Sequence, residues 1–186
     1  MITLFITQEE KNRSLNFAKE IINGGNQFDR FNQSNSTQII RTYVGKLAEY
    51  IFLHFLHSRN IVVPEGDMFE IYIGSQNVDA CDFVLPNGQS IDIKTASLPF
   101  HKRIMVPITQ FHLRKDFYVG IKLNFNTSTK LIDVDNIKTA IIHGYTTRET
   151  LETQPTQNFG EGFCKAYPLT SLLNIEQLIK MYNDFR

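Results

Sequence analysis

The spacing of apolar residues changes once along the chain, near Ile61, and separates a helical part from a part rich in strands. Before Ile61, apolar residues recur every three or four positions. This spacing predicts a helix at 8–23 and a second helix, buried over much of its surface, at 38–60. The polar run at 32–37 between them is typical of a loop.

After Ile61, apolar and polar residues alternate in short runs, as they do in half-buried strands. The expected strands are 61–63, 69–73, 81–85, 90–96, 103–106, 116–125 and 137–145, with an edge strand at 164–169. Short helices are expected after a cap at Thr146 and at 175–184. The order of helices, strands and then helices predicts one α/β domain over residues 1–186, in which a mixed β-sheet is flanked by helices.

The composition limits where the protein works and what it binds. The 19 Lys and Arg residues balance the 19 Asp and Glu residues, which argues against a uniformly basic surface but leaves room for a local basic groove. Cys81 and Cys164 are the only cysteines, too few for a disulfide framework. No apolar run reaches the roughly 18 residues that a membrane span needs. We therefore expect a cytoplasmic protein that does not associate with membranes.

The segment at 81–97, CDFVLPNGQSIDIKTAS, predicts a hairpin that is mostly apolar but carries three charges. The Pro-Asn-Gly sequence at 86–88 suits a three-residue turn, with glycine at the left-handed position. That turn pairs Phe83 with Ile91 and directs both toward the core. A two-residue turn would shift the register by one residue and reverse the faces.

The three-residue turn brings the three charges together. Asp82 then faces Asp92 directly, and Lys94 lies on the same face. Two opposed carboxylates about 5 Å apart at Cβ repel each other, and one lysine does not neutralise both. A divalent ion such as Mg²⁺, which takes oxygen ligands, would do so. The alternative is an exposed strand face whose charges are solvated, and the spacing alone leaves both readings open.

These residues resemble the PD-(D/E)xK nuclease superfamily, which has the restriction-endonuclease-like fold. The resemblance consists of an acidic residue that begins one strand, Asp82, and an acidic-x-Lys triplet in the next, 92–94. A preceding helix segment, VGKLAEYIF, matches the family's upstream helix and contains Glu49. The match covers about residues 45–95. It departs from the family pattern in two ways, because Cys81 stands in place of a proline and the triplet begins with Asp instead of the commoner Glu.

The resemblance implies an α/β/α core and Mg²⁺-dependent hydrolysis of phosphodiester bonds. Asp82, Asp92 and the main-chain carbonyl of Ile93 would bind Mg²⁺, for which Mn²⁺ could substitute. Lys94 would orient the attacking water or stabilise the negative charge that develops on the phosphate. A restriction-type DNA endonuclease is the first expectation, and cleavage of a duplex favours a homodimer with two sites.

Two further carboxylates, Glu49 and Asp79, are candidates for the metal site. Glu49 lies on a helix with few solvent-facing positions, so we expect it to face the metal site, as a ligand through water or for a second ion. The alternative is a surface ion pair with Lys46. Asp79 is a rival for the role of Asp82, but the register puts it on the face opposite to Asp92.

A nuclease without a basic excess must concentrate its cations near the cleft. The candidates for contacts to nucleic acid are His101, Lys102, Arg103, Gln110, Arg114 and Lys115. For each of them a solvated loop is the alternative. His54 and His57 share the long helix but have no third ligand in the sequence, so we expect no zinc site.

Other functions fit the same residues. One is a nucleic-acid-binding or partner-binding module that keeps the fold without catalysis, and another is a nuclease specific for RNA or for DNA junctions. The intact acidic pair and lysine favour catalysis, because a binding module has no need for three charges that are costly to bury.

Overall fold

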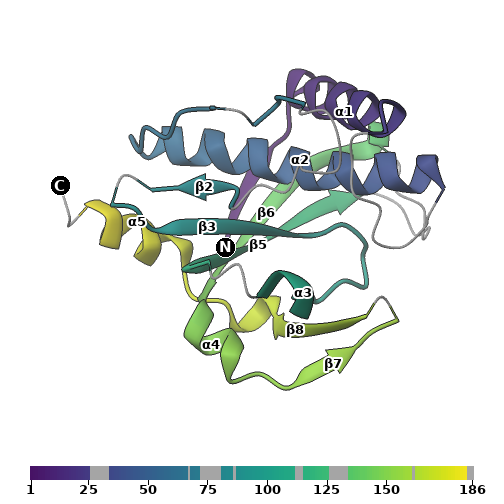
Figure 1. Ribbon diagram of the computed structural model, residues 1–186. Coiled ribbons are helices and arrows are strands. Elements are labelled where there is room, and N and C mark those ends of the chain that lie inside the picture. Colours follow the sequence, from purple (N-terminus) through teal and green to yellow (C-terminus); the bar gives the residue numbers. More distant parts are fainter. Residues whose placement is uncertain are drawn as a thin grey trace.

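The computed structural model describes residues 1–25, 34–66, 68–71, 81–85, 87–111, 115–125, 134–160 and 162–183 (Figure 1). The fold class predicted from the sequence is confirmed, because the chain forms a single mixed α/β domain with a curled mixed sheet flanked by helices. A second sheet, which the sequence did not predict, accompanies the first. None of the helices in the described residues is long and apolar enough to cross a membrane.

The elements follow one another along the chain with few interruptions. The helices are α1 (Gln8–Asn23), α2 (Asn35–Ser58), α3 (Ile108–Phe111), α4 (Arg148–Glu152) and α5 (Ile175–Asn183), with 3-10 turns at Val134–Asn136 and Leu169–Ser171. The strands are β1 (Ile2–Phe5), β2 (Phe83–Val84), β3 (Ser90–Ala96), β4 (Arg103–Pro107), β5 (Phe117–Phe125), β6 (Ile137–Thr147), β7 (Thr156–Asn158) and β8 (Phe163–Pro168).

The main sheet has five strands in the order β1-β6-β5-β3-β2. Strand β3 pairs parallel with β5, and the other pairs are antiparallel. One face of the sheet packs against α2, whose apolar residues occupy nearly its whole circumference and supply about a third of the buried residues of the principal core. Helix α1 lies on the outer side of α2 (Figure 1), and the capping box of Thr7 and Glu10 fixes its start.

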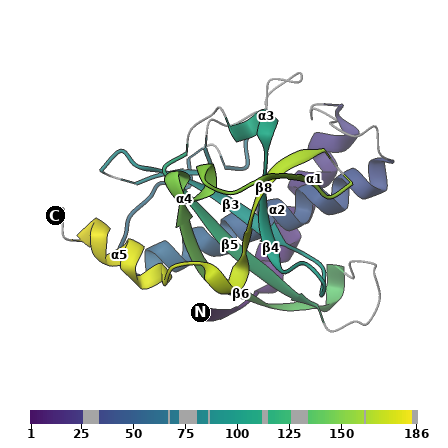
Figure 2. The ribbon, with the colours of Figure 1, turned by 90° about the horizontal axis from the view of Figure 1, so that it is seen from below.

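The other face of the main sheet packs against the second sheet, which has the order β4-β8-β7 (Figure 2). A smaller core fills the space between them. Its buried members are Ala96, Ile104, Val106, Tyr118, Leu151 and Leu169. The alternation of side chains along β3 therefore serves both cores, because Ile91 and Ile93 face α2 while Ala96 faces the second sheet.

Some expected strands are wrong. Residues 61–63 form no strand, and neither do residues 69–71, the described part of the expected strand at 69–73. Ile61 and Val63 are buried and Val62 is exposed, so the alternation reflects packing next to the end of α2 and not pairing in a sheet. Strand β8 is not an edge strand, because it lies between β4 and β7.

Two helix starts differ from the expected ones. Helix α2 begins at Asn35 after the N-cap residue Ser34, so the end of the predicted loop is helical. Helix α4 is capped by Thr147, whose side chain accepts from the Thr150 N–H, and not by Thr146. Thr146 is instead buried in β6, where its side chain faces the second core beside Tyr118.

A β-bulge in β6 brings the C-terminal part of the chain onto the sheet. Gly120 lies opposite Gly144 but Ile121 lies opposite Ile142, so His143 is the extra residue. Gly144 has a φ of +146°, and a Cβ there would clash with the carbonyl oxygen of Leu173. The main chain of Leu173 pairs with Tyr145 in an isolated antiparallel bridge, and it can approach β6 this closely only because residue 144 has no side chain.

We expect Gly144→Ala to lower the free energy of unfolding by roughly 2–4 kcal/mol, since the alanine suffers both a strained φ and a backbone clash. The matched control is Gly45→Ala, where a Cβ meets no described atom within 4 Å and the helix should gain roughly 0.5–1 kcal/mol. Urea unfolding followed by circular dichroism measures both. Equal stability of Gly144→Ala and the parent would show that Leu173 does not pack so closely against residue 144.

Candidate active site

The register of the β2–β3 hairpin decides which charges can meet, and it is the predicted one. Phe83 lies opposite Ile91, and both side chains belong to the principal core. The Leu85 N–H donates to the Gln89 carbonyl at 2.8 Å, which closes the three-residue turn, and Gly88 has the expected left-handed φ of +85°. Three residues singled out from the sequence, Asp79, Pro86 and Arg114, lie outside the described residues.

The ladder of hydrogen bonds between β2 and β3 ends at Asp82, where a side chain replaces the main chain. Asp82 Oδ2 accepts a hydrogen bond from the Ile93 N–H at 2.5 Å, while the Asp82 N–H donates to the Ile91 carbonyl at 3.1 Å. In an antiparallel ladder the N–H and C=O of one hydrogen-bonded residue point to the same neighbour. The Ile93 carbonyl is therefore directed toward the same edge of β3 as the Asp82 carboxylate.

Asp82 lies in an environment that disfavours its charge. Burial raises the pKa of Asp82 well above its ordinary value, and the charges of Glu49 and Asp92 raise it further. Lys94 and the Ile93 N–H act in the opposite direction. Glu49 and Asp92 are thus both near enough to Asp82 to act on its charge.

Each of the other two carboxylates has its own lysine. Lys94 Nζ contacts Asp92 Oδ2 at 2.5 Å, although in a geometry that makes no hydrogen bond. Lys46 Nζ donates to Glu49 Oε2 at 2.6 Å. The sequence left open whether Glu49 pairs with Lys46 at the surface or faces the site. The pair does form, but it is largely buried, with side-chain exposures of 9% and 18%, and Glu49 still acts on Asp82.

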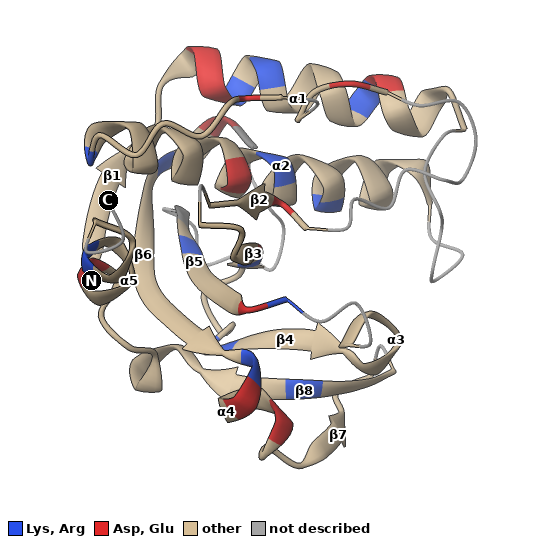
Figure 3. Cartoon of the chain, turned by 60° about the vertical axis from the view of Figure 1, so that its left-hand side comes forward, with Lys and Arg blue, Asp and Glu red and all other residues tan. Residues whose placement is uncertain are grey.

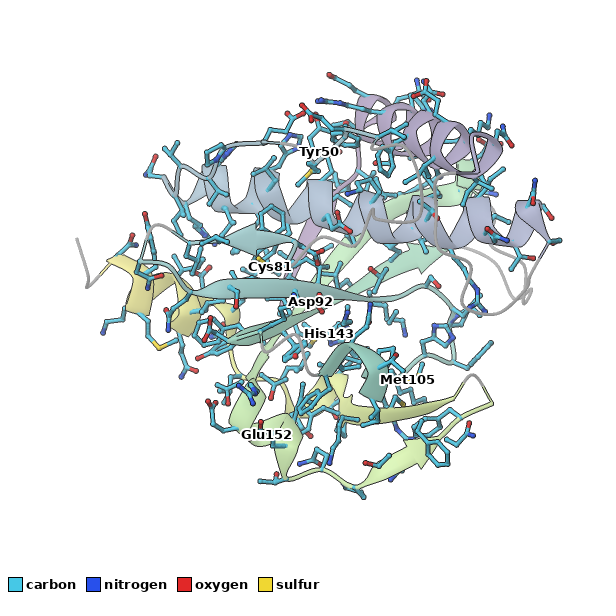
Figure 4. All side chains as sticks on the ribbon, in the orientation of Figure 1. Tyr50, Cys81, Asp92, Met105, His143 and Glu152 are labelled. Carbon is cyan, nitrogen blue, oxygen red and sulfur yellow. The ribbon has the colours of Figure 1, made fainter. Side chains whose placement is uncertain are left out.

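The candidate site wraps around the edge of β3. Glu49 approaches from α2 on one face of the main sheet, and Asp82 lies at the edge next to Ile93. Asp92 lies on the opposite face, between the two sheets (Figure 4), and Lys94, two residues along β3, shares that face. Figure 3 shows that charged positions of α2 lie beside the β2–β3 hairpin. Asp82 is the one carboxylate of the three that has no lysine of its own among the described contacts, and its raised pKa favours the neutral form.

The donor atoms at this edge suit a small hard cation that keeps part of its water. Among the described residues, no three His, Cys, Asp or Glu side chains are grouped so that they could hold a metal ion. Two carboxylates, Asp82 and Asp92, and the Ile93 carbonyl remain as donors, and this set is typical of Mg²⁺ sites. A role for Glu49 through a water molecule stays a prediction.

Four of the residues expected to contact nucleic acid lie between β3 and the end of α3, and a fifth, Lys115, is buried between α3 and β5. The ring of His101 has a structural role, because its Nδ1 accepts from the N–H groups of Ser97 and Leu98 at 3.3 Å and so closes the turn after β3. Lys102 is exposed, and its carbonyl accepts from the Leu169 N–H at 2.9 Å. These contacts neither support nor oppose binding of nucleic acid.

Two further candidates belong to β4 and α3. Arg103 is exposed on β4, with its guanidinium 5.3 Å from the centre of the Phe159 ring. Gln110 is half-buried on α3. Both lie on the second sheet or its flanking helix, on the side of β3 where Asp92 and Lys94 point, and their role stays a prediction.

The sequence did not predict the burial of several polar side chains, among them Lys115, which was expected to contact nucleic acid. The atoms without a hydrogen-bond partner in the described part of the chain include Tyr118 Oη, Lys115 Nζ, Arg148 Nε and both ring nitrogens of His143. Burial lowers the pKa of His143, and Lys122 adds to the effect. The only signal for Tyr118 in the sequence was its place on the polar side of β5, among Gly120 and Lys122.

No protein-family model, no curated protein and no solved structure matches the chain. A function therefore has to be argued from the arrangement of the residues described above.

We expect Asp82→Asn to stabilise the protein in metal-free buffer by an amount that grows with pH. The raised pKa of Asp82 means that the folded state holds its proton more tightly than the unfolded state. The parent's free energy of unfolding should therefore fall as the pH rises from about 4, the ordinary value, through the raised pKa, whereas the variant lacks this loss. Urea unfolding in EDTA at a series of pH values measures the difference.

The control for this experiment is Glu20→Gln, which removes one exposed carboxylate from α1. A stability difference between Asp82→Asn and the parent that does not change between pH 4 and pH 8 would contradict the environment assigned to Asp82.

Proposed function

We propose that the chain is a metal-dependent nuclease of the PD-(D/E)xK type that hydrolyses phosphodiester bonds in DNA. The observation that carries the proposal is the uncompensated Asp82 carboxylate beside Asp92 at the edge of β3, with Lys94 two residues further along the same strand. Buried carboxylates close together are costly unless a cation binds them. A divalent ion bound between the two carboxylates would remove that cost, and its presence would explain why they lie so close together.

The donor set fits Mg²⁺, with Mn²⁺ as a substitute, through Asp82, Asp92 and the Ile93 carbonyl. Such an ion polarises a bound phosphate and lowers the pKa of a bound water. The hydrogen bond from the Ile93 N–H holds Asp82 Oδ2 in position before any ligand arrives. That preorganisation reduces the entropy cost of binding.

Lys94 and Glu49 would act on the reacting groups. The Lys94 ammonium has three donors, and its contact with Asp92 keeps it at the edge of the site. It would donate to a non-bridging phosphate oxygen and stabilise the negative charge that develops there as water attacks and the P–O bond breaks. Glu49, oriented by Lys46, would accept a proton or a hydrogen bond from the attacking water.

The proposal extends to a restriction-type enzyme that acts as a homodimer. One site cleaves one strand, so the cleavage of both strands of a duplex at one position calls for two sites. The exposed Lys102 and Arg103, on the same side of β3 as Lys94, would then contact the phosphate backbone.

A cleavage assay on a panel of nucleic acids tests the proposal. Supercoiled plasmid, linear duplex, single-stranded DNA, a four-way junction and RNA are incubated with the protein in Mg²⁺, in Mn²⁺ and in EDTA. We expect cleavage of duplex DNA with either metal and none in EDTA, and loss of cleavage in Asp82→Asn and Asp92→Asn. The Glu20→Gln variant should cleave as the parent does, while failure of the parent on all five substrates would reject the proposal.

We expect Lys94→Met to slow single-turnover cleavage by about 100- to 1000-fold, because it removes one preorganised donor from the transition state. Lys94→Arg should not restore the rate, since a planar guanidinium does not replace a compact ammonium. Stabilisation by Mg²⁺ in thermal unfolding should persist in both variants. The exposed Lys180 on α5 supplies the control Lys180→Met, and cleavage by Lys94→Met at the parental rate would exclude a catalytic role.

A binding module without catalysis is the second candidate, and one observation favours it. Lys94 already contacts Asp92, and Lys46 already contacts Glu49, so two of the three carboxylates are compensated without a metal. For such a module, nucleic acid should bind equally well in EDTA and in Mg²⁺, and no substrate of the panel should be cleaved.

A further inference from the structure

Two phenylalanine rings are exposed near the start of β4. Phe100, in the turn between β3 and β4, is 58% exposed, and Phe159, directly after β7, is 42% exposed. The Arg103 guanidinium lies 5.3 Å from the centre of the Phe159 ring, so the end of β7 comes close to the start of β4. Phe100 precedes Arg103 by three residues, which span about 11 Å at most. Both rings therefore lie near Arg103.

The turn that carries Phe100 is anchored to two other parts of the fold. Lys122 Nζ, from β5, donates to the Pro99 carbonyl at 3.2 Å. The Leu169 N–H, at the end of β8, donates to the Lys102 carbonyl at 2.9 Å. The fold gains little burial from the Phe100 ring, and a ligand that stacks on this ring does not have to order the turn first.

The charges around the two rings are positive. Residues 93–115 include five Lys and Arg residues and no Asp or Glu, although the formal net charge of the chain is zero. Lys102 and Arg103 of this stretch are exposed. Glu161, the acidic residue nearest to Phe159 in the sequence, lies outside the described residues. These charges favour a polyanion as the ligand.

We propose that Phe100, Arg103 and Phe159 form a stacking site for the unpaired bases of single-stranded DNA, with Lys102 on the phosphate backbone. Exposed rings beside cations bind single strands of any sequence, because every base has a π face and the cations follow the backbone. An internal base pair of a duplex has no free face for a ring, so the site distinguishes single strands from duplexes. That the bound strand is a substrate rests on the proposed function, but its binding does not.

Fluorescence anisotropy in EDTA tests the stacking site without cleavage. Three fluorescein-labelled ligands are compared, namely a single strand of about 12 nucleotides, an abasic strand with the same number of phosphates, and the duplex of the same length. We expect the parent to bind the single strand roughly tenfold or more tightly than the abasic strand, because only a strand with bases can stack on the rings.

Substitutions separate stacking from charge. Phe100→Leu and Phe159→Leu keep an apolar side chain but lose the aromatic face, so each should weaken binding of the single strand by about fivefold or more and leave the abasic strand unaffected. Lys102→Ala should instead lower the salt dependence for both strands, by about 0.7 in the slope of log association constant against log salt concentration. The control is Phe5→Leu, on β1, where an 86% exposed phenylalanine should be replaceable without loss of affinity.

The proposal is overturned if the parent binds the single strand and the abasic strand equally, or if both leucine variants near Arg103 keep the parental affinity. Tighter binding of the duplex than of the single strand also overturns it, and tighter binding of an RNA strand of the same sequence overturns the assignment to DNA. Because both rings are exposed, the Tm of each leucine variant should lie within about 2 °C of the parental Tm. A larger loss would overturn the assignment of that ring, because it would show a structural role.

Two results separate this inference from the proposed function. A parent that binds the single strand through its bases but cleaves no substrate retains the stacking site and rejects the nuclease. A parent that cleaves duplex DNA in Mg²⁺ but binds the abasic strand as tightly as the single strand retains the nuclease and rejects the stacking site. If both hold, a duplex with a single-stranded overhang should be cleaved faster than a blunt duplex, and equal rates would reject the bound strand as part of the substrate.

Discussion

Strand β3 pairs with β2 on one edge, running antiparallel, and with β5 on the other, running parallel. Its side chains therefore alternate between the two faces of the main sheet, one covered by α2 and the other by the second sheet. Ile91 and Ile93 must face α2, because the principal core would otherwise lose two of its buried residues. The residues between and after them, Asp92 and Lys94, are then forced into the space between the two sheets. The position of the candidate site therefore follows from the packing of the core.

The lysines at the edge of β3 pair with two of the three carboxylates there and not with the third. Lysines accompany Asp92 and Glu49, each within the same element as its carboxylate. Asp82 has no such neighbour, since it stands where β2 begins and its side chain is occupied with the Ile93 N–H. That hydrogen bond orients the carboxylate but does not neutralise it, and burial beside Glu49 and Asp92 raises the pKa of Asp82.

Local patterns in the sequence were sufficient for the parts of the fold that depend on neighbours in the chain. The bounds of α1, the alternation along β5 and the register set by residues 86–88 all follow from short-range rules, and the structure bears them out. The pairing of β1 with β6 and the separate second sheet depend on contacts distant in sequence, and no local pattern encodes them. For the same reason the burial of Lys46 and the surroundings of Tyr118 were not foreseen.

The pairing of β1 with β6 has a consequence for how the chain acquires its structure. Ile2 lies opposite Ile142, so β1 cannot pair until β6, about 140 residues later in the chain, has been synthesised. The packing of α1 on α2 joins segments that are close in sequence and can form much earlier. During synthesis β1 therefore stays unpaired beside a helical hairpin that can form without it, and the edge of the main sheet closes only late in folding.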